Sequence, residues 1–105
     1  GEQLVRLGNF IYTFERADLV EYNAENLALR IKLRMQNNEK FPVNFWNQNF
    51  RLLVDSVPRA PSGDLNLLVE GGSALDGELE FLVPKQSNSL SLRILDGDDK
   101  TEVKL

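Results

Sequence analysis

The segment Leu27–Met35 alternates without interruption between two kinds of residue. One set is Leu27, Leu29, Ile31, Leu33 and Met35, and the residues between them are Ala28, Arg30, Lys32 and Arg34. A β-strand with one buried and one solvated face requires this period of two, whereas a helix would scatter the apolar residues around its axis. The pattern therefore predicts a β protein.

Composition indicates one domain spanning residues 1–105. A chain of 105 residues with 42% hydrophobic residues can form a core without disulfides, and it contains no cysteine. The absence of cysteine leaves the redox compartment open. A net charge of −4 argues against binding to the phosphate backbone of nucleic acids or to anionic lipid, so we expect no nucleic-acid partner.

The chain begins at Gly1 and not at a methionine. This start predicts a processed protein or an added first residue, with upstream sequence missing. Charges interrupt every apolar stretch, so we expect no signal peptide or membrane span within the chain. Contact with a membrane is therefore expected only through an anchor outside this segment.

The remaining chain predicts about seven antiparallel strands in two sheets. The expected strands are Phe10–Tyr22 with a bulge near Ala17, Leu27–Gln36, Phe45–Val57, Leu65–Val69, Glu78–Val83, Leu90–Ile94 and a last strand ending at Leu105. The expected turns and loops are Asn23–Asn26, Pro58–Gly63, Gly71–Ser73 and Asp96–Asp99. Within Phe45–Val57, Trp46 shares the phase of Phe50, Leu52 and Val54, which predicts Trp46 in the core and Phe45 on the surface.

The order of these features resembles the immunoglobulin-like domains of bacterial exported proteins and lipoproteins, a group called immunoprotective-extracellular-like. The pieces that carry the resemblance are the close of the first alternating strand at Gln36-Asn37-Asn38, the strand Asn49–Asp55, the loop Pro58–Pro61, the segment Gly77–Pro84 and the strand Leu90–Ile94. The resemblance implies an immunoglobulin-like β-sandwich outside the cytoplasm, beside a lipid anchor, membrane segment or further domain, without catalytic residues. The cysteine pair of antibody domains is absent.

A basic stripe follows one face of the alternating strand. Arg30, Lys32 and Arg34 could hold a polyanion. In an immunoglobulin-like order, however, the second and fifth strands are neighbours, which predicts Glu78 and Glu80 opposite the stripe as cross-strand pairs. We interpret the stripe as structural, because a compensated stripe has little long-range field.

Aromatic residues gather near the start of the third expected strand. Phe41 and Phe45, with Asn47 and Asn49, could form a surface that binds a carbohydrate or a peptide. This ligand-binding face is the alternative to a purely structural role for the segment.

The acidic turn near the C-terminus offers hard oxygen ligands. Asp96, Asp98 and Asp99 could bind Ca²⁺ together with Glu102. The spaced ligand pattern of a calcium loop is missing, and an Asp-Gly hairpin turn explains the same residues. We therefore predict a turn and no metal or other cofactor, with calcium as the alternative.

The residue types predict that the chain is not an enzyme. It has no histidine and no cysteine, which removes the usual nucleophile and base pairs and most transition-metal sites. Chemistry by two carboxylates would have to use Glu15, Asp18, Glu21 or Asp55, and none lies in a recognisable motif.

These observations predict a non-catalytic interaction or spacer module located outside the cytoplasm, in the periplasm, at the cell surface or secreted. A protein partner is expected at a sheet edge, where unpaired backbone groups accept an added strand, and a homodimer could form by the same route. The alternative function is the small-ligand binder described above.

Overall fold

The alternation of Leu27–Met35 corresponds to an inner strand of an antiparallel sheet. The computed structural model describes residues 3–105, in which the one helical element is a short 3-10 turn, η1 (Asn47–Asn49). The strands are β1 (Gln3–Leu7), β2 (Phe10–Glu21), β3 (Asn26–Asn37), β4 (Val43–Trp46), β5 (Phe50–Val54), β6 (Val57–Arg59), β7 (Asn66–Val69), β8 (Ala74–Pro84), β9 (Leu90–Asp96) and β10 (Asp99–Lys104). The predicted all-β class is confirmed.

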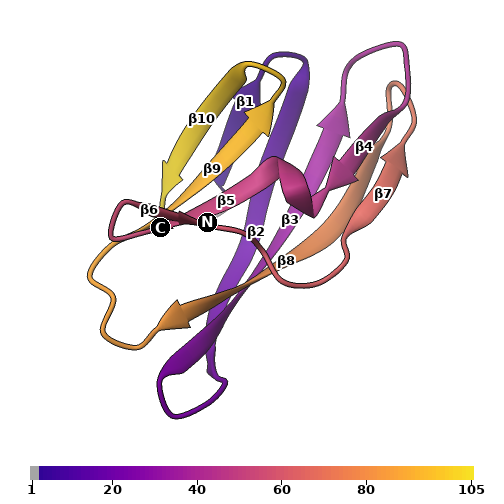
Figure 1. Cartoon of the computed structure of the whole chain (residues 1–105). Helices are drawn as coiled ribbons and strands as arrows, with labels where there is room; N and C mark the ends of the chain where they lie inside the picture. Colours follow the sequence, from indigo (N-terminus) through magenta and orange to yellow (C-terminus); the bar gives the residue numbers. More distant parts are fainter. Residues whose placement is uncertain (1–2) are drawn as a thin grey trace.

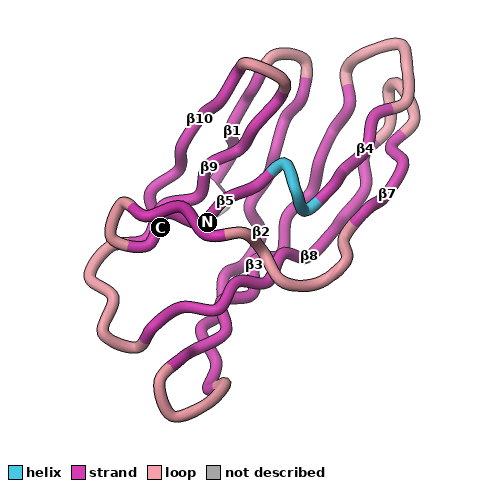
Figure 2. The backbone as a smooth tube through the Cα atoms, viewed as in Figure 1, coloured by secondary structure: helices cyan, strands magenta, loops and turns pink. Residues whose placement is uncertain are grey.

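These strands form two four-stranded sheets and one two-stranded ribbon within residues 3–105. The first sheet has the order β1-β2-β3-β8, and the second has the order β10-β9-β5-β6. The β4–β7 ribbon pairs antiparallel and lies at the end of the molecule where β3 ends and β8 begins (Figures 1 and 2). All pairings between these strands are antiparallel.

One apolar core lies between the two sheets. The predicted apolar face of β3 is buried from Leu29 to Met35, and the basic residues between are exposed. Leu52 of β5 and Leu92 of β9 belong to the same buried cluster as Ile31 of β3. Full burial of one such side chain stabilises the fold by about 1.5–3 kcal/mol, so the alternation in sequence has a direct energetic reason.

The prediction of one strand over Phe45–Val57 is wrong. This segment consists of the end of β4, the turn η1, β5 and the start of β6. The turn breaks the period of two, so Phe45 is 1% exposed and Trp46 is 43% exposed, the reverse of the prediction. Asn47 stabilises the turn because its buried side chain donates a hydrogen bond from Nδ2 to the Gly63 carbonyl oxygen at 2.8 Å.

Two strands were not expected from the sequence. β1 precedes the first predicted strand and pairs with the start of β2. β6 occupies part of the expected loop at Pro58–Gly63, and a tight turn at Asp55 and Ser56 connects it to β5. Pro58 fits there because β6 is at the edge of its sheet, where a missing backbone donor breaks no ladder.

Other local predictions agree with the structure. The register between β2 and β3 shifts between Phe14 and Arg16, close to the bulge expected near Ala17. The predicted acidic turn connects β9 to β10, and its Gly97 has a φ of 58°. A positive φ at this position is the reason that a hairpin turn favours glycine.

Gly77 in β8 makes room for the ring of Phe45. A Cβ atom added at Gly77 would lie 2.8 Å from Cε2 of Phe45 and 2.9 Å from Cδ1 of Leu65. The close approach lets the buried ring of Phe45 attach the β4–β7 ribbon to the first sheet.

Candidate functional site

The predicted ligand-binding residues do not form one exposed face. Phe41 is 72% exposed, but Phe45 and Asn47 are buried and Asn49 is partly buried. Phe45 packs in the core, where its ring centroid lies 6.1 Å from that of Phe50. The prediction that Phe45 and Asn47 bind a ligand at the surface is therefore corrected. The side chain of Phe45 packs in the core, and that of Asn47 stabilises the η1 turn.

The outer face of the β4–β7 ribbon exposes a different group of residues. The register pairs Trp46 with Asn66 and Asn44 with Leu68, and all four side chains are exposed. Asn44 Nδ2 donates a hydrogen bond to Asn66 Oδ1 at 2.9 Å. Sequence reasoning missed this group by placing Trp46 in the core, although the weak strand formers that follow it could have signalled a break.

The basic stripe of β3 lies opposite acidic residues of β8, as predicted. The register places Arg30 opposite Glu80 and Lys32 opposite Glu78. Arg30 Nε donates a hydrogen bond to Glu80 Oε2 at 3.1 Å. Exposed ion pairs contribute only about 0–1 kcal/mol each, so the pairs mainly cancel the charge of the stripe.

Arg34 finds an acidic partner that the sequence analysis did not name. Its Nε lies 2.8 Å from Oδ1 of Asp76. The hydrogen bond from Arg34 is the largest cause that lowers the pKa of Asp76 below its usual value, and the charge of Lys32 contributes in the same direction.

A shallow hollow of about 300 Å³ lies on the outer face of the first sheet. It is lined by Arg16, Asp18, Leu19, Val20, Arg30, Lys32 and Glu78. Arg16 Nε lies 2.8 Å from Asp18 Oδ2, and Arg30 is paired with Glu80, so two of the three cations of the hollow are neutralised locally.

The acidic turn between β9 and β10 was the candidate calcium site. Within residues 3–105, no group of three acidic side chains is placed to hold a metal ion. Glu102 instead accepts a hydrogen bond from Arg93 at 3.0 Å. Desolvation is the main cause that raises the pKa of Asp96, and the charges of Asp99 and Glu39 add to the shift. Burial also raises the pKa of Tyr12, to which Asp96 contributes.

The four carboxylates considered for catalysis lie in separate settings. Asp18 pairs with Arg16, and Glu15 lies at the bulge of β2. Asp55 Oδ1 accepts hydrogen bonds from the backbone N–H groups of Asn88 and Ser89, both at 2.9 Å.

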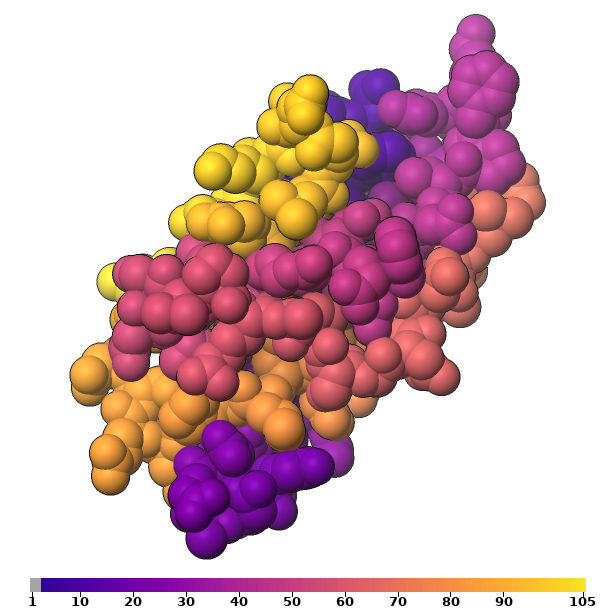
Figure 3. Space-filling model, viewed as in Figure 1, coloured from indigo at the N-terminus to yellow at the C-terminus, as the bar shows by residue number. Residues whose placement is uncertain are grey.

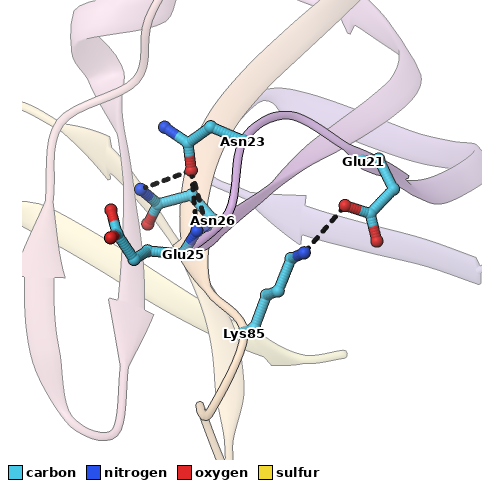
Figure 4. A network of polar contacts seen from close by, with 5 residues as sticks. All are labelled: Glu21, Asn23, Glu25, Asn26 and Lys85. Atoms are coloured by element: carbon cyan, nitrogen blue, oxygen red, sulfur yellow. Dashed lines mark hydrogen bonds and ion pairs between the residues drawn. The ribbon is translucent and has the colours of Figure 1, made fainter.

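Glu21 belongs to a polar network at the far end of the first sheet (Figure 4). Lys85 Nζ donates to Glu21 Oε2 at 2.8 Å, and the Lys85 backbone N–H donates to the Glu25 carbonyl oxygen at 2.9 Å. Asn23 Oδ1 accepts hydrogen bonds from the backbone N–H groups of Glu25 and Asn26. These contacts tie the turn between β2 and β3 to the end of β8.

The second half of β2 is paired on one side only. Within residues 3–105, the pairing of β1 with β2 ends at Gln3 and Phe14, whereas β2 continues along β3 to Glu21. Leu19 in this half is 52% exposed. We call the segment 16–21 the β2 free edge. A groove of about 330 Å³ begins beside it, lined by Gln3, Phe14, Glu15, Arg16, Ala17, Ile31, Lys104 and Leu105.

No helix within residues 3–105 is long and apolar enough to span a membrane.

Comparisons with known proteins identify the fold but no family. No protein-family model matches the chain, and no curated protein matches it. Solved structures do match, among them three from Bacillus, although identities of this size establish the fold alone. One is ycdA, a candidate lipoprotein from Bacillus subtilis subsp. subtilis str. 168, with a TM-score of 0.78 and 15% identity over 100% of this chain. The chain spans only 38% of the ycdA chain.

Two further matches cover nearly all of both chains. The yjhA protein of Bacillus subtilis gives a TM-score of 0.78 at 18% identity, over 98% of this chain and 96% of that chain. A conserved hypothetical protein of Bacillus anthracis gives a TM-score of 0.65 at 9% identity, over 97% of this chain and 92% of that chain. The architecture therefore exists both as most of a chain and as part of a longer one.

Proposed function

We propose that this chain is a non-catalytic, extracytoplasmic interaction module with an immunoglobulin-like β-sandwich, and that it binds a partner protein by strand addition at the β2 free edge. The observation that carries the proposal is that, within residues 3–105, segment 16–21 pairs only with β3. Alternate N–H and C=O groups along such an edge point away from the sheet and can accept another strand.

The sheet order supports an immunoglobulin-like sandwich. In that fold the first, second and fifth strands are neighbours in one sheet, and the third, sixth and seventh are neighbours in the other. The orders β2-β3-β8 and β10-β9-β5 correspond to these two sets if β7 is counted as the fourth strand. β1, β4 and β6 are then additions to the basic plan.

The proposed location outside the cytoplasm is based on the structural similarity to a candidate lipoprotein. The candidate lipoprotein ycdA has the same fold over the whole of this chain. A lipid anchor or membrane segment, if the protein has one, would lie outside residues 3–105.

The non-catalytic role is supported by the side chains. The chain has no histidine or cysteine. The carboxylates of Asp18, Glu21 and Asp55 are each engaged in local contacts that hold the fold.

The β2 free edge differs from the sheet edges formed by β6 and β8. β6 spans only Val57–Arg59 and contains Pro58, which lacks a backbone donor. The outer edge of β8 is partly occupied, because the Ser62 backbone N–H donates to the Glu80 carbonyl oxygen at 2.8 Å. Segment 16–21 is longer than β6, contains no proline and includes the exposed Leu19.

Site-specific photo-crosslinking tests the proposal. A photoreactive phenylalanine analogue at Leu19 in the source cell should form a protein adduct. The matched control is the same analogue at Val57, which is 58% exposed on the β6 edge, and it should form no adduct. Absence of an adduct at position 19, or equal adducts at both positions, would contradict the proposal.

A second copy of the chain is one source of the added strand. Light scattering of the purified chain identifies this case, because self-pairing predicts a dimer that Leu19→Lys dissociates. If the purified chain is monomeric, the partner must be a different protein. The protein crosslinked to position 19 should then be identified by mass spectrometry as something other than a second copy of this chain.

A further inference from the structure

The outer face of the β4–β7 ribbon presents the only tryptophan of the chain. Strand alternation places Phe45 and Val69 on the inner face, where both are buried, and Trp46 and Leu68 on the outer face. Trp46 lies directly opposite Asn66, and Leu68 lies diagonal to Trp46. We call Asn44, Trp46, Asn66 and Leu68 the ribbon face. Figure 3 shows the ribbon on the surface, where β4 and β7 adjoin at the right of the molecule.

One hydrogen bond orients the two asparagine side chains of the ribbon face. Asn44 Nδ2 donates to Asn66 Oδ1 at 2.9 Å. Within residues 3–105, Asn44 Oδ1, Asn66 Nδ2 and the indole N–H of Trp46 have no further protein partner. The ribbon face therefore offers both hydrogen-bond acceptors and donors around an exposed aromatic ring.

The ribbon face is held rigid from below. Phe45 and Val69 belong to the main core, and Asn37 Nδ2 donates to the Val69 carbonyl oxygen at 3.0 Å. At the other end of the ribbon, the Asn47 backbone N–H donates to the Leu65 carbonyl oxygen at 2.9 Å. A surface fixed in this way loses little conformational entropy when a ligand binds.

We propose that the ribbon face binds a neutral saccharide, with one sugar ring stacked on Trp46 and its hydroxyl groups paired with Asn44 and Asn66. The C–H face of a pyranose is apolar enough to pack against an indole, and neighbouring hydroxyl groups need adjacent donors and acceptors. β4 and β7 contain no charged residue, so nothing on the two strands selects a phosphate, sulfate or carboxylate group. Leu68 provides an apolar floor for a second ring.

The size of the ribbon face favours a sugar over a protein. A stable protein interface buries about 800 Å² on each partner, which four side chains do not supply. One or two sugar rings match the extent of an indole, two amides and one leucine. The proposal is independent of the β2 free edge, which lies on a different sheet.

Tryptophan fluorescence provides a direct assay, because Trp46 is the only indole. A panel of neutral oligosaccharides, namely cello-, manno-, malto- and chito-oligosaccharides, should include at least one that shifts the emission and binds in calorimetry. Trp46→Ala should abolish binding, and Asn66→Ala should weaken it about tenfold. Trp46→Phe, which keeps a ring for stacking, should retain part of the affinity.

The matched control is Phe41→Ala, because Phe41 is an exposed aromatic outside the ribbon strands and its loss should leave binding unchanged. The proposal would be overturned if no oligosaccharide of the panel bound at concentrations up to about 10 mM, since a dissociation constant above that value is too weak for a specific site. Binding that survives Trp46→Ala in a folded variant would also overturn it. A sugar-independent dimer that Trp46→Ala dissociates would overturn it in favour of a protein interface, while crosslinking at Leu19 would remain a separate result.

Discussion

The side chain of Asn37 donates a hydrogen bond from Nδ2 to the carbonyl oxygen of Val69 at 3.0 Å, across 32 positions of the chain. The same nitrogen donates to the Phe41 carbonyl oxygen at 2.8 Å, and Asn37 Oδ1 accepts the backbone N–H of Glu39 at 2.9 Å. Asn37 is fully buried, so each of these groups is satisfied by protein and not by water. The side chain joins the end of β3 to the β4–β7 ribbon.

Asn37→Ala should therefore lower the free energy of unfolding by about 2–3 kcal/mol, because it removes the side-chain donor from the buried bond to the Val69 carbonyl and from the partly buried bond to the Phe41 carbonyl. Urea unfolding measures the change. The control Asn38→Ala removes an exposed neighbour and should change stability by less than about 0.5 kcal/mol. Equal effects of the two substitutions on the free energy of unfolding would show that the hydrogen bonds of Asn37 do not contribute more than those of an exposed asparagine.

Gly77→Ala should lower the free energy of unfolding by about 1–3 kcal/mol, because its methyl group overlaps the ring of Phe45. The neighbouring exposed substitution Glu78→Ala serves as the control and should have a small effect. Denaturant midpoints at equal slope give the comparison. An unchanged midpoint for Gly77→Ala would mean that the ring moves aside without cost.

Ser56→Gly should raise the free energy of unfolding by about 0.5–1 kcal/mol. Ser56 has a φ of 71° in the two-residue turn between β5 and β6, a conformation that glycine adopts without the Cβ clash. Ser73→Gly is the matched control, since Ser73 has no positive φ, and it should not stabilise the protein. Thermal melting of both variants tests the prediction, which fails if Ser56→Gly melts at or below the wild-type temperature.

Asp96→Asn should raise the melting temperature at pH 7 but not near pH 3. The folded protein raises the pKa of Asp96 above its ordinary value of 3.8, so the ionised form is the one that folding disfavours. This contribution to stability is intact below about pH 3.8 and is lost as the pH rises through the folded pKa. The amide variant has no such loss.

Melting temperatures measured from pH 3 to pH 7 test the Asp96 prediction. Asp98→Asn makes the same change in net charge at the exposed tip of the turn and should not show a gain that grows with pH. A gain of equal size at both ends of the range would assign the effect of Asp96→Asn to something other than its ionisation.

Some features of the candidate surfaces could be predicted from the sequence and others could not. The charge pairing of Arg30 with Glu80 could be predicted, because strand order and alternation together determine which side chains face each other. The ribbon face was predicted wrongly, because the η1 turn shifts the phase between Trp46 and Phe50 and exchanges the inner and outer faces. The one-sided pairing of segment 16–21 within residues 3–105 could not be predicted, because no residue pattern in β2 itself indicates which strands lie beside it.

The sequence alone determined the β class, the buried face of β3, the bulge of β2 and the acidic turn at Gly97. These features depend on neighbouring residues, through side-chain alternation and backbone conformation, so a short segment contains the information. Only the tertiary structure decided that Phe45 is buried, that Asn37 is enclosed by three hydrogen-bond partners and that segment 16–21 pairs only with β3 among residues 3–105. Each of these three features depends on contacts between segments that are distant along the chain. Whether such a residue is buried depends on what packs against it and not on its own type.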